Sequence, residues 1–244
     1  LVAITERQHR QEATAVLDAL TNSLIGAHIR VYRRIFTTSI DAGSLWTDID
    51  TNDSGITTDY RDTQFAAQAV SDGRVIAASR ADIDAELSET TPAGPAEAVD
   101  TTDPQQMQQL AEELIATIAG GNAAPTLASR IGGVIVSDLA ARDLLLGVSA
   151  RTPGQAAILW TRVARQLRGQ ARIQALAITA AMAYSSGDGV RAGSALDAAR
   201  DLANNTNTAY PSLARLLDVA LQGGIPPNEV LSVLTRYADK YHRP

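Results

Sequence analysis

The sequence predicts an α+β protein: a small, partly parallel mixed sheet with helices in residues 1–90, followed by an all-helical bundle. Three observations support this fold class. Residues 1–90 alternate between short β-branched or apolar runs and stretches with helical periodicity. Residues 88–104 contain three prolines among small polar residues, which is typical of a linker. Beyond residue 104 the apolar residues recur every three or four positions, which is typical of helices.

The first elements predict a parallel crossover. The apolar run Leu1–Ile4 predicts a strand, and Glu6–Leu24 predicts a helix that Gly26 closes just after its last turn. The β-branched and aromatic residues of His28–Ile40 predict a second strand. A strand, a helix and a strand in succession favour parallel pairing, and Ser44–Ile49 is expected to pair back as a third strand.

The rest of the N-terminal unit is expected to mix a loop with short elements. The acidic stretch Asp48–Asp62 predicts a flexible loop. A helix is expected over Thr63–Ser71 and a short strand over Arg74–Ala77. Ser79 is a suitable N-cap for a helix over Arg80–Leu87. We therefore expect an α/β unit at 1–90, a linker at 91–103 and a helical bundle at 104–244.

In the helical half, Asp103-Pro104 is a helix start signal, because an N-cap residue precedes proline at the first helical position. The glycine pair Gly132-Gly133 inside Thr126–Val148 indicates either a close helix contact or a break. Trp46 and Trp160 are expected to be core anchors. The remaining helices are expected at 104–119, 153–167, 171–185, 189–203, 211–222 and 226–237.

Composition excludes several classes of chemistry. No run approaches the roughly 18 apolar residues of a membrane span, and the absence of cysteine excludes disulfides and thiolate chemistry. The three histidines have no ligand spacing, and Lys240, the only lysine, is badly placed for catalysis. The net charge of −6 without a basic stripe disfavours nucleic acid as a partner. We expect no metal, no cofactor, no membrane partner and a cytoplasmic location.

A few charged residues remain as candidates. Arg162–Arg172 places four arginines on one helical face, which indicates a solvated face or, alternatively, an anion or nucleic-acid surface. Arg142-Asp143 is a charged pair in an apolar helix, either a polar edge or an ion pair that orients the helical half. The candidate binding residues are therefore Arg74, Arg80, Arg142 and Asp143. No catalytic residue is assigned.

The glycines and small residues of Ala183–Pro227 resemble a tetratricopeptide hairpin. Gly187 is followed by Ala192, Leu196 and Ala199 at the spacing that such a repeat has across its turn. Only one copy is present, so the resemblance implies a single repeat-like hairpin inside a helical bundle.

Several motifs occur in an order that resembles the actinobacterial Domain of Unknown Function 4192 family over nearly the whole chain. The resemblance implies the mixed fold and assigns no reaction. The chain departs from the family pattern in two places. Members generally begin with a further strand-rich region, and they often carry a cysteine- and proline-rich segment where this chain has Thr47–Asp53. The matching residues are Thr5-Glu6-Arg7, Trp46, Gly73-Arg74-Val75-Ile76 with Ser79-Arg80, Arg142-Asp143-Leu144-Leu145, Gly187-Asp188 with Ala192, Leu213-Ala214-Arg215-Leu216-Leu217 and Gly224-Ile225-Pro226-Pro227.

The sequence assigns no activity and leaves open whether the protein is an enzyme. It favours a non-enzymatic interaction or scaffold protein that binds another protein or a second copy of itself. The alternative is a small-ligand-binding protein or enzyme with its site at the carboxyl ends of the strands. Arg74, Arg80 and the Asp48–Asp62 loop would supply that site.

Overall fold

The computed structural model of the protein describes residues 1–71, 77 and 79–240. It divides the chain into two compact units, Leu1–Ile76 and Ala77–Pro244. The division falls earlier than the linker predicted at 91–103, because helix α3 (Arg80–Glu86) packs on helix α9 (Gly189–Asn205) of the second unit. The strand predicted over residues 74–77 falls almost wholly outside the described residues.

The first unit contains a four-stranded mixed sheet with the order β1-β2-β3-β4. β1 (Val2–Ile4) pairs in parallel with β2 (Ile35–Thr37), which confirms the predicted crossover. β3 (Leu45–Asp48) and β4 (Ser54–Ile56) complete the sheet as antiparallel neighbours. Trp46 of β3 lies against Gly55 of β4, where a Cβ atom would come within 2.6 Å of the indole ring. A larger residue at position 55 would therefore displace the indole.

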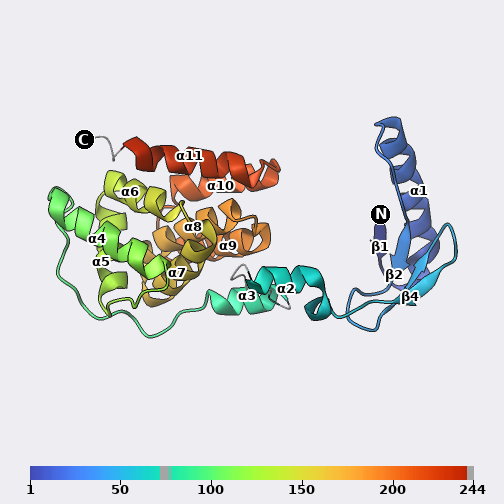
Figure 1. Ribbon diagram of the computed structural model, residues 1–244, viewed down its shortest axis with the longest axis horizontal. Coiled ribbons are helices and arrows are strands. Elements are labelled where there is room, and N and C mark those ends of the chain that lie inside the picture. The colour runs from blue at the N-terminus through green and yellow to red at the C-terminus, as the bar shows by residue number, and fades with distance from the viewer. Residues whose placement is uncertain (72–76, 78, 241–244) are drawn as a thin grey trace. The chain divides into compact units, whose positions relative to one another are not determined.

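Helix α1 (Arg10–Gly26) is the crossover between β1 and β2 and lies beside the sheet (Figure 1). Its Leu17 is buried, as is Phe36 of β2, and the Arg10 guanidinium lies 5.3 Å from the centre of the Phe36 ring. Burial of these apolar side chains supplies most of the free energy that holds a helix on a sheet. The short helices η1 (Arg7–His9), η2 (Tyr60–Asp62) and α2 (Gln64–Ser71) complete the unit.

Three details of the first unit correct the sequence-based expectations. Residues 28–34 are not in a strand, because the three residues of β1 pair only with Ile35–Thr37. Gly26 is the last residue of α1, and His28, with φ of 60°, is the residue in the left-handed region. The stretch Asp48–Asp62 is not a simple flexible loop, because it contains β4 and η2.

The second unit is helical, as predicted. Ser79 and Asp82 form a reciprocal capping box at α3, and Asp103 caps α4 through the N–H of Gln105 at 2.8 Å. Its further helices are α4 (Pro104–Ile118), α5 (Leu127–Ser137), α6 (Leu139–Ser149), α7 (Pro153–Gln166), α8 (Gly169–Ser185), α10 (Ser212–Gln222) and α11 (Pro227–Lys240). None of the helices in the described part of the chain is long and apolar enough to cross a membrane.

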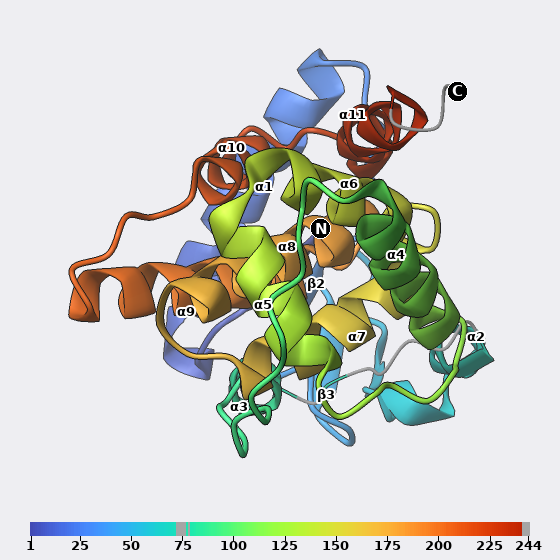
Figure 2. The ribbon, with the colours of Figure 1, turned by 90° about the vertical axis from the view of Figure 1, so that its left-hand side faces the viewer.

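Helix α8 is the centre of the second unit (Figure 2). Every residue from Arg172 to Ser185 is buried, and α8 packs against α5, α7, α9, α10 and α11. A helix that is apolar on all sides avoids water only by being surrounded in this way. Ala192, Leu196 and Ala199 of α9 are buried too. The residues that resemble a tetratricopeptide turn therefore belong to this core.

The glycine pair in α5 makes a close contact and does not break the helix. The break predicted within Thr126–Val148 lies instead at Asp138, an extended residue that caps the N-terminus of α6. At Gly132 an added Cβ atom would lie 2.7 Å from Leu167 and 3.5 Å from Ala171, whereas Gly133 faces open space. Gly132 therefore allows α5 to approach the turn between α7 and α8.

The two adjacent glycines give a matched test of this contact. We expect Gly133→Ala to stabilise the protein by about 0.5–1 kcal/mol, because alanine favours the helix over glycine. Gly132→Ala should be less stable than Gly133→Ala by about 1–3 kcal/mol, because its Cβ overpacks against Leu167. Urea unfolding of the two variants measures the difference. Equal stability would show that α5 is not held this closely.

Candidate functional site

The residues that the sequence singled out lie in separate ion pairs. Arg80, the first residue of α3, donates to Asp197 of α9 at 2.5 Å. Arg142 and Asp143 bind each other within α6, with Arg142 Nε and Nη2 at 3.0 and 2.6 Å from Asp143 Oδ1. Arg74 lies outside the described residues. Arg80 thus links α3 to α9. Arg142 and Asp143 neutralise each other within α6.

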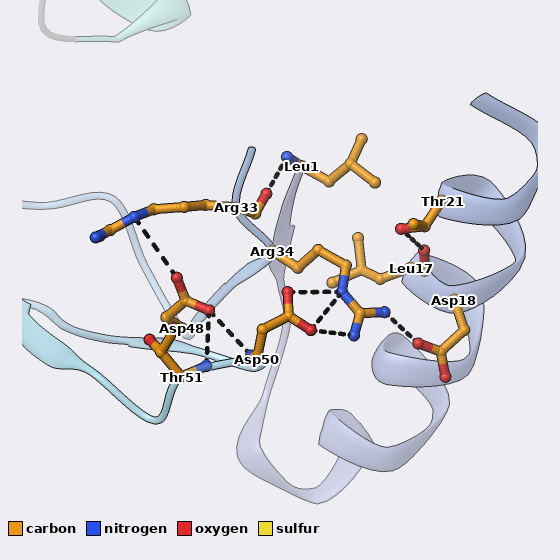
Figure 3. A network of polar contacts seen from close by, with 9 residues as sticks. All are labelled: Leu1, Leu17, Asp18, Thr21, Arg33, Arg34, Asp48, Asp50 and Thr51. Carbon is orange, nitrogen blue, oxygen red and sulfur yellow. Dashed lines mark hydrogen bonds and ion pairs between the residues drawn. The ribbon is translucent and has the colours of Figure 1, made fainter. Parts of the chain in front are cut away.

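Acidic residues in the first unit form a network around Arg34 (Figure 3). Arg34 binds Asp18 of α1 and Asp50 of the β3–β4 turn, the latter through Nε at 3.0 Å and Nη2 at 2.5 Å. These hydrogen bonds hold the pKa of Asp50 below its ordinary value. Asp48, which is 1% exposed, accepts from the N–H groups of Asp50 and Thr51.

This network fixes the turn between β3 and β4 and ties it to α1. The carboxylates of Asp48 and Asp50 have protein partners, which hold this part of the chain in place where the sequence predicted a flexible loop. Within residues 1–71, 77 and 79–240, no group of three or more acidic or histidine side chains could hold a metal ion. The carboxylates of this network therefore serve the local fold.

The arginine-rich stretch Arg162–Arg172 is only partly solvated. Arg165, Arg168 and Arg172 donate to the backbone carbonyls of Ser88, Thr90 and Leu87 at 3.0, 2.5 and 2.7 Å. We call residues 87–94 the strap, since Thr90 and Ala93 also donate backbone hydrogen bonds to the end of α7. The arginines therefore hold the strap on the helical unit.

Arg172 is the most buried member of this cluster, at 7% exposed. It also donates to the Ala164 carbonyl at 2.8 Å, near the C-terminus of α7, where a positive charge is favourable. Burial lowers its pKa, the carboxylate of Glu89 opposes this, and the nearby Arg168 and Arg165 lower it further. The contacts of the cluster thus account for its position without a ligand.

The described part of the helical unit contains a groove between α4 and α6. It has a volume of about 600 Å³ and a mostly apolar lining. Ile115 in its wall is 41% exposed, so a large apolar side chain of the lining is open to solvent. We call this feature the α4–α6 groove. Its lining residues are Thr101, Thr102, Pro104, Met107, Gln108, Ala111, Glu112, Ile115, Asp138, Ala140, Ala141, Leu144 and Val148.

Two acidic residues line the α4–α6 groove, and no basic residue does. Asp138 accepts from the N–H groups of Ala140 and Ala141 at 2.8 and 3.1 Å. Its pKa is lowered by the backbone hydrogen bond from Ala141 and by the hydroxyl of Thr101. Glu112 is exposed and accepts one hydrogen bond, from Gln108 Nε2 at 2.8 Å.

The stretch of chain that leads into and includes α4 is acidic as well. Residues 81–129 contain nine Asp or Glu and no Lys, Arg or His. Arg130 and Arg142 are the basic residues of α5 and α6, and each is paired with a carboxylate. The groove therefore combines a mostly apolar lining with two acidic side chains and no basic one.

The α4–α6 groove is not among the features that the sequence predicts. The absence of basic residues over 81–129 is visible in the sequence, but it does not indicate a groove. The groove itself was not predictable, because it depends on how α4 packs against α6, and these helices are separated along the chain by α5. Local patterns specify a helix and its apolar face, but they do not specify which helix it meets.

Comparison with known proteins gives one match. The model of a family described as Domain of unknown function (DUF4192) matches residues 1–228. Searches of curated proteins and of solved structures each found no match. The actinobacterial source and the tetratricopeptide resemblance are not tested by this match and stay predictions. Because the matched region covers nearly the whole chain, the protein belongs to the DUF4192 family.

Proposed function

We propose that this protein is a non-enzymatic interaction protein, and that its α4–α6 groove binds an apolar helical segment of another protein. The observation that carries the proposal is the groove, with its volume of about 600 Å³ and its mostly apolar lining. Exposed apolar concavities of this kind are typical of binding surfaces. A cytoplasmic location is part of the proposal and accords with the cysteine-free sequence.

A helix is the occupant that suits the walls of the groove best. Both walls are helices, and side-chain ridges of a third helix can pack into the space between two others. Ala111, Ala140 and Ala141 are small lining residues that permit a close approach. Partner helices bound in such grooves insert apolar side chains spaced three and four residues apart.

The proposal predicts that a bulky residue in the groove abolishes binding. Ala140 is exposed and lines the groove, so Ala140→Trp should fill part of it without disturbing the core. Peptides selected by the full chain from a phage-displayed random library should lose at least about tenfold in affinity, which is 1.4 kcal/mol. Fluorescence anisotropy of the labelled peptides measures the dissociation constants.

Ala116→Trp is the matched control, because Ala116 is an exposed residue of α4 that does not line the groove. Binding should be unchanged in this variant. Equal losses in both variants would contradict the proposal, and so would a selection that enriches no peptide. Enriched peptides without apolar residues at helical spacing would exclude a helix as the occupant.

A further inference from the structure

We infer that the segment bound in the α4–α6 groove carries positive charge and that Glu112 selects it. This inference rests on the function proposed above and names the chemical class of the partner: an amphipathic helix with Lys or Arg beside its apolar stripe. Three features of the groove support it: the exposed carboxylate of Glu112, whose Oε2 has no partner among the described residues, the carboxylate of Asp138, which caps α6, and the absence of basic residues from the lining.

Glu112 is in the right place to contact a partner. It belongs to the same face of α4 as Gln108, Ala111 and Ile115, all of which line the groove. Its side chain is exposed, and the hydrogen bond from Gln108 at 2.8 Å uses only Oε1. Oε2 has no protein partner among the described residues. A Lys or Arg that follows the apolar stripe of a bound helix would therefore meet an available acceptor.

Asp138 is less suited to this role, although it is also acidic and also lines the groove. Its carboxylate caps α6 through the N–H groups of Ala140 and Ala141 and interacts with the hydroxyl of Thr101. A partner that drew this carboxylate away would leave the first turn of α6 without its cap. Glu112 caps no helix, so it can bind a partner without the loss of a cap. We therefore assign the selection of the partner to Glu112.

The charge around the groove favours the same class of partner. An acidic segment would be repelled by Glu112 and Asp138, which are the two charged residues of the lining. The lining residues other than Glu112 and Asp138 are neutral, so nothing in the groove would compensate the repulsion. A basic segment meets attraction along the same path, which raises its association rate and its specificity.

The test selects phage-displayed random peptides with the full chain and with three variants, Glu112→Gln, Glu112→Arg and Glu97→Arg. Glu97 is exposed and belongs to the same acidic stretch, but it does not line the groove. Peptides selected by the unaltered chain should be enriched in Lys and Arg. The dissociation constants of these peptides should rise about two- to fivefold in Glu112→Gln, as expected for one exposed ion pair.

The reversed charge gives the sharper result. Selection with Glu112→Arg should lose the basic enrichment and favour Asp or Glu, whereas selection with Glu97→Arg should keep it. If both arginine variants change the selection equally, the general field and not Glu112 selects the partner, and the inference is wrong. Peptides that depend on the groove, are blocked by Ala140→Trp and show no charge bias would overturn the inference while sustaining the proposed function. A selection without groove-dependent peptides would overturn both.

Discussion

Trp160→Ala is expected to lower the free energy of unfolding of the helical unit by about 3–5 kcal/mol, a large effect for a single substitution. Trp160 is completely buried in the core of the helical unit. Its removal would leave a large cavity among close-packed helices, whose side chains relax only in part. Its Nε1 also donates to Ser149 Oγ at 2.9 Å, and that hydrogen bond would be lost.

Trp160→Phe separates the two contributions. Phenylalanine keeps much of the apolar volume and removes the donor, so we expect a loss of about 1–2 kcal/mol. Chemical unfolding followed by far-ultraviolet circular dichroism measures both variants, because the helical unit supplies most of the helical signal. Fluorescence is less suitable, since Trp46 is the only other tryptophan and would dominate the variant spectra. A loss below about 1 kcal/mol for Trp160→Ala would contradict the packing of α7.

Arg172→Met is expected to cost about 2–4 kcal/mol and to loosen the strap. Methionine replaces the aliphatic stem of arginine, but it carries no charge and cannot donate hydrogen bonds. The carbonyls of Leu87 and Ala164 would lose their guanidinium donors inside the protein, and Glu89 would lose one of its two arginine partners. The Ala164 carbonyl keeps the N–H of Leu167 as a donor at 3.3 Å, so the cost arises mainly at Leu87, because a buried acceptor without a partner costs about 1–3 kcal/mol.

Hydrogen exchange gives the local readout. The amide groups of Thr90 and Ala93, which donate to Arg165 and Gln166, should exchange at least about tenfold faster in Arg172→Met. Arg162→Met is the matched control, because the exposed Arg162 side chain makes no hydrogen bond or ion pair with any residue that the structure describes. If the two variants exchange at the same rate, Arg172 does not hold the strap.

Much of the local structure was predictable, and for physical reasons that are confined to short stretches of chain. The capping box at Ser79 and Asp82 and the start at Asp103-Pro104 satisfy the free N–H groups of a helix from a few neighbouring residues. The parallel crossover followed from the order of a strand, a helix and a strand. The order of the motifs was also enough to identify the family.

The errors arose where a distant partner decides the local state. Residues 28–34 have a composition suited to a strand, but β1 offers pairing to only three residues of β2. The Asp48–Asp62 stretch is polar enough for a loop, yet β3 recruits Ser54–Ile56 into the sheet. The arginines of Arg162–Arg172 were interpreted as a solvated face or an anion or nucleic-acid surface, whereas three of them donate to backbone carbonyls of the strap.

The sequence by itself determined the α+β class, most helix boundaries, the family and the charge bias of residues 81–129. The first two depend on patterns in short stretches of chain, and the family on the order of motifs along it. The tertiary structure alone decided that α4 and α6 enclose a groove, and that Glu112 faces it while the charges of Arg80, Arg142 and Asp143 are used in ion pairs. The physical reason is that packing between helices depends on the combined shapes of surfaces far apart in the chain. No local pattern encodes those shapes, and the candidate site exists only where they meet.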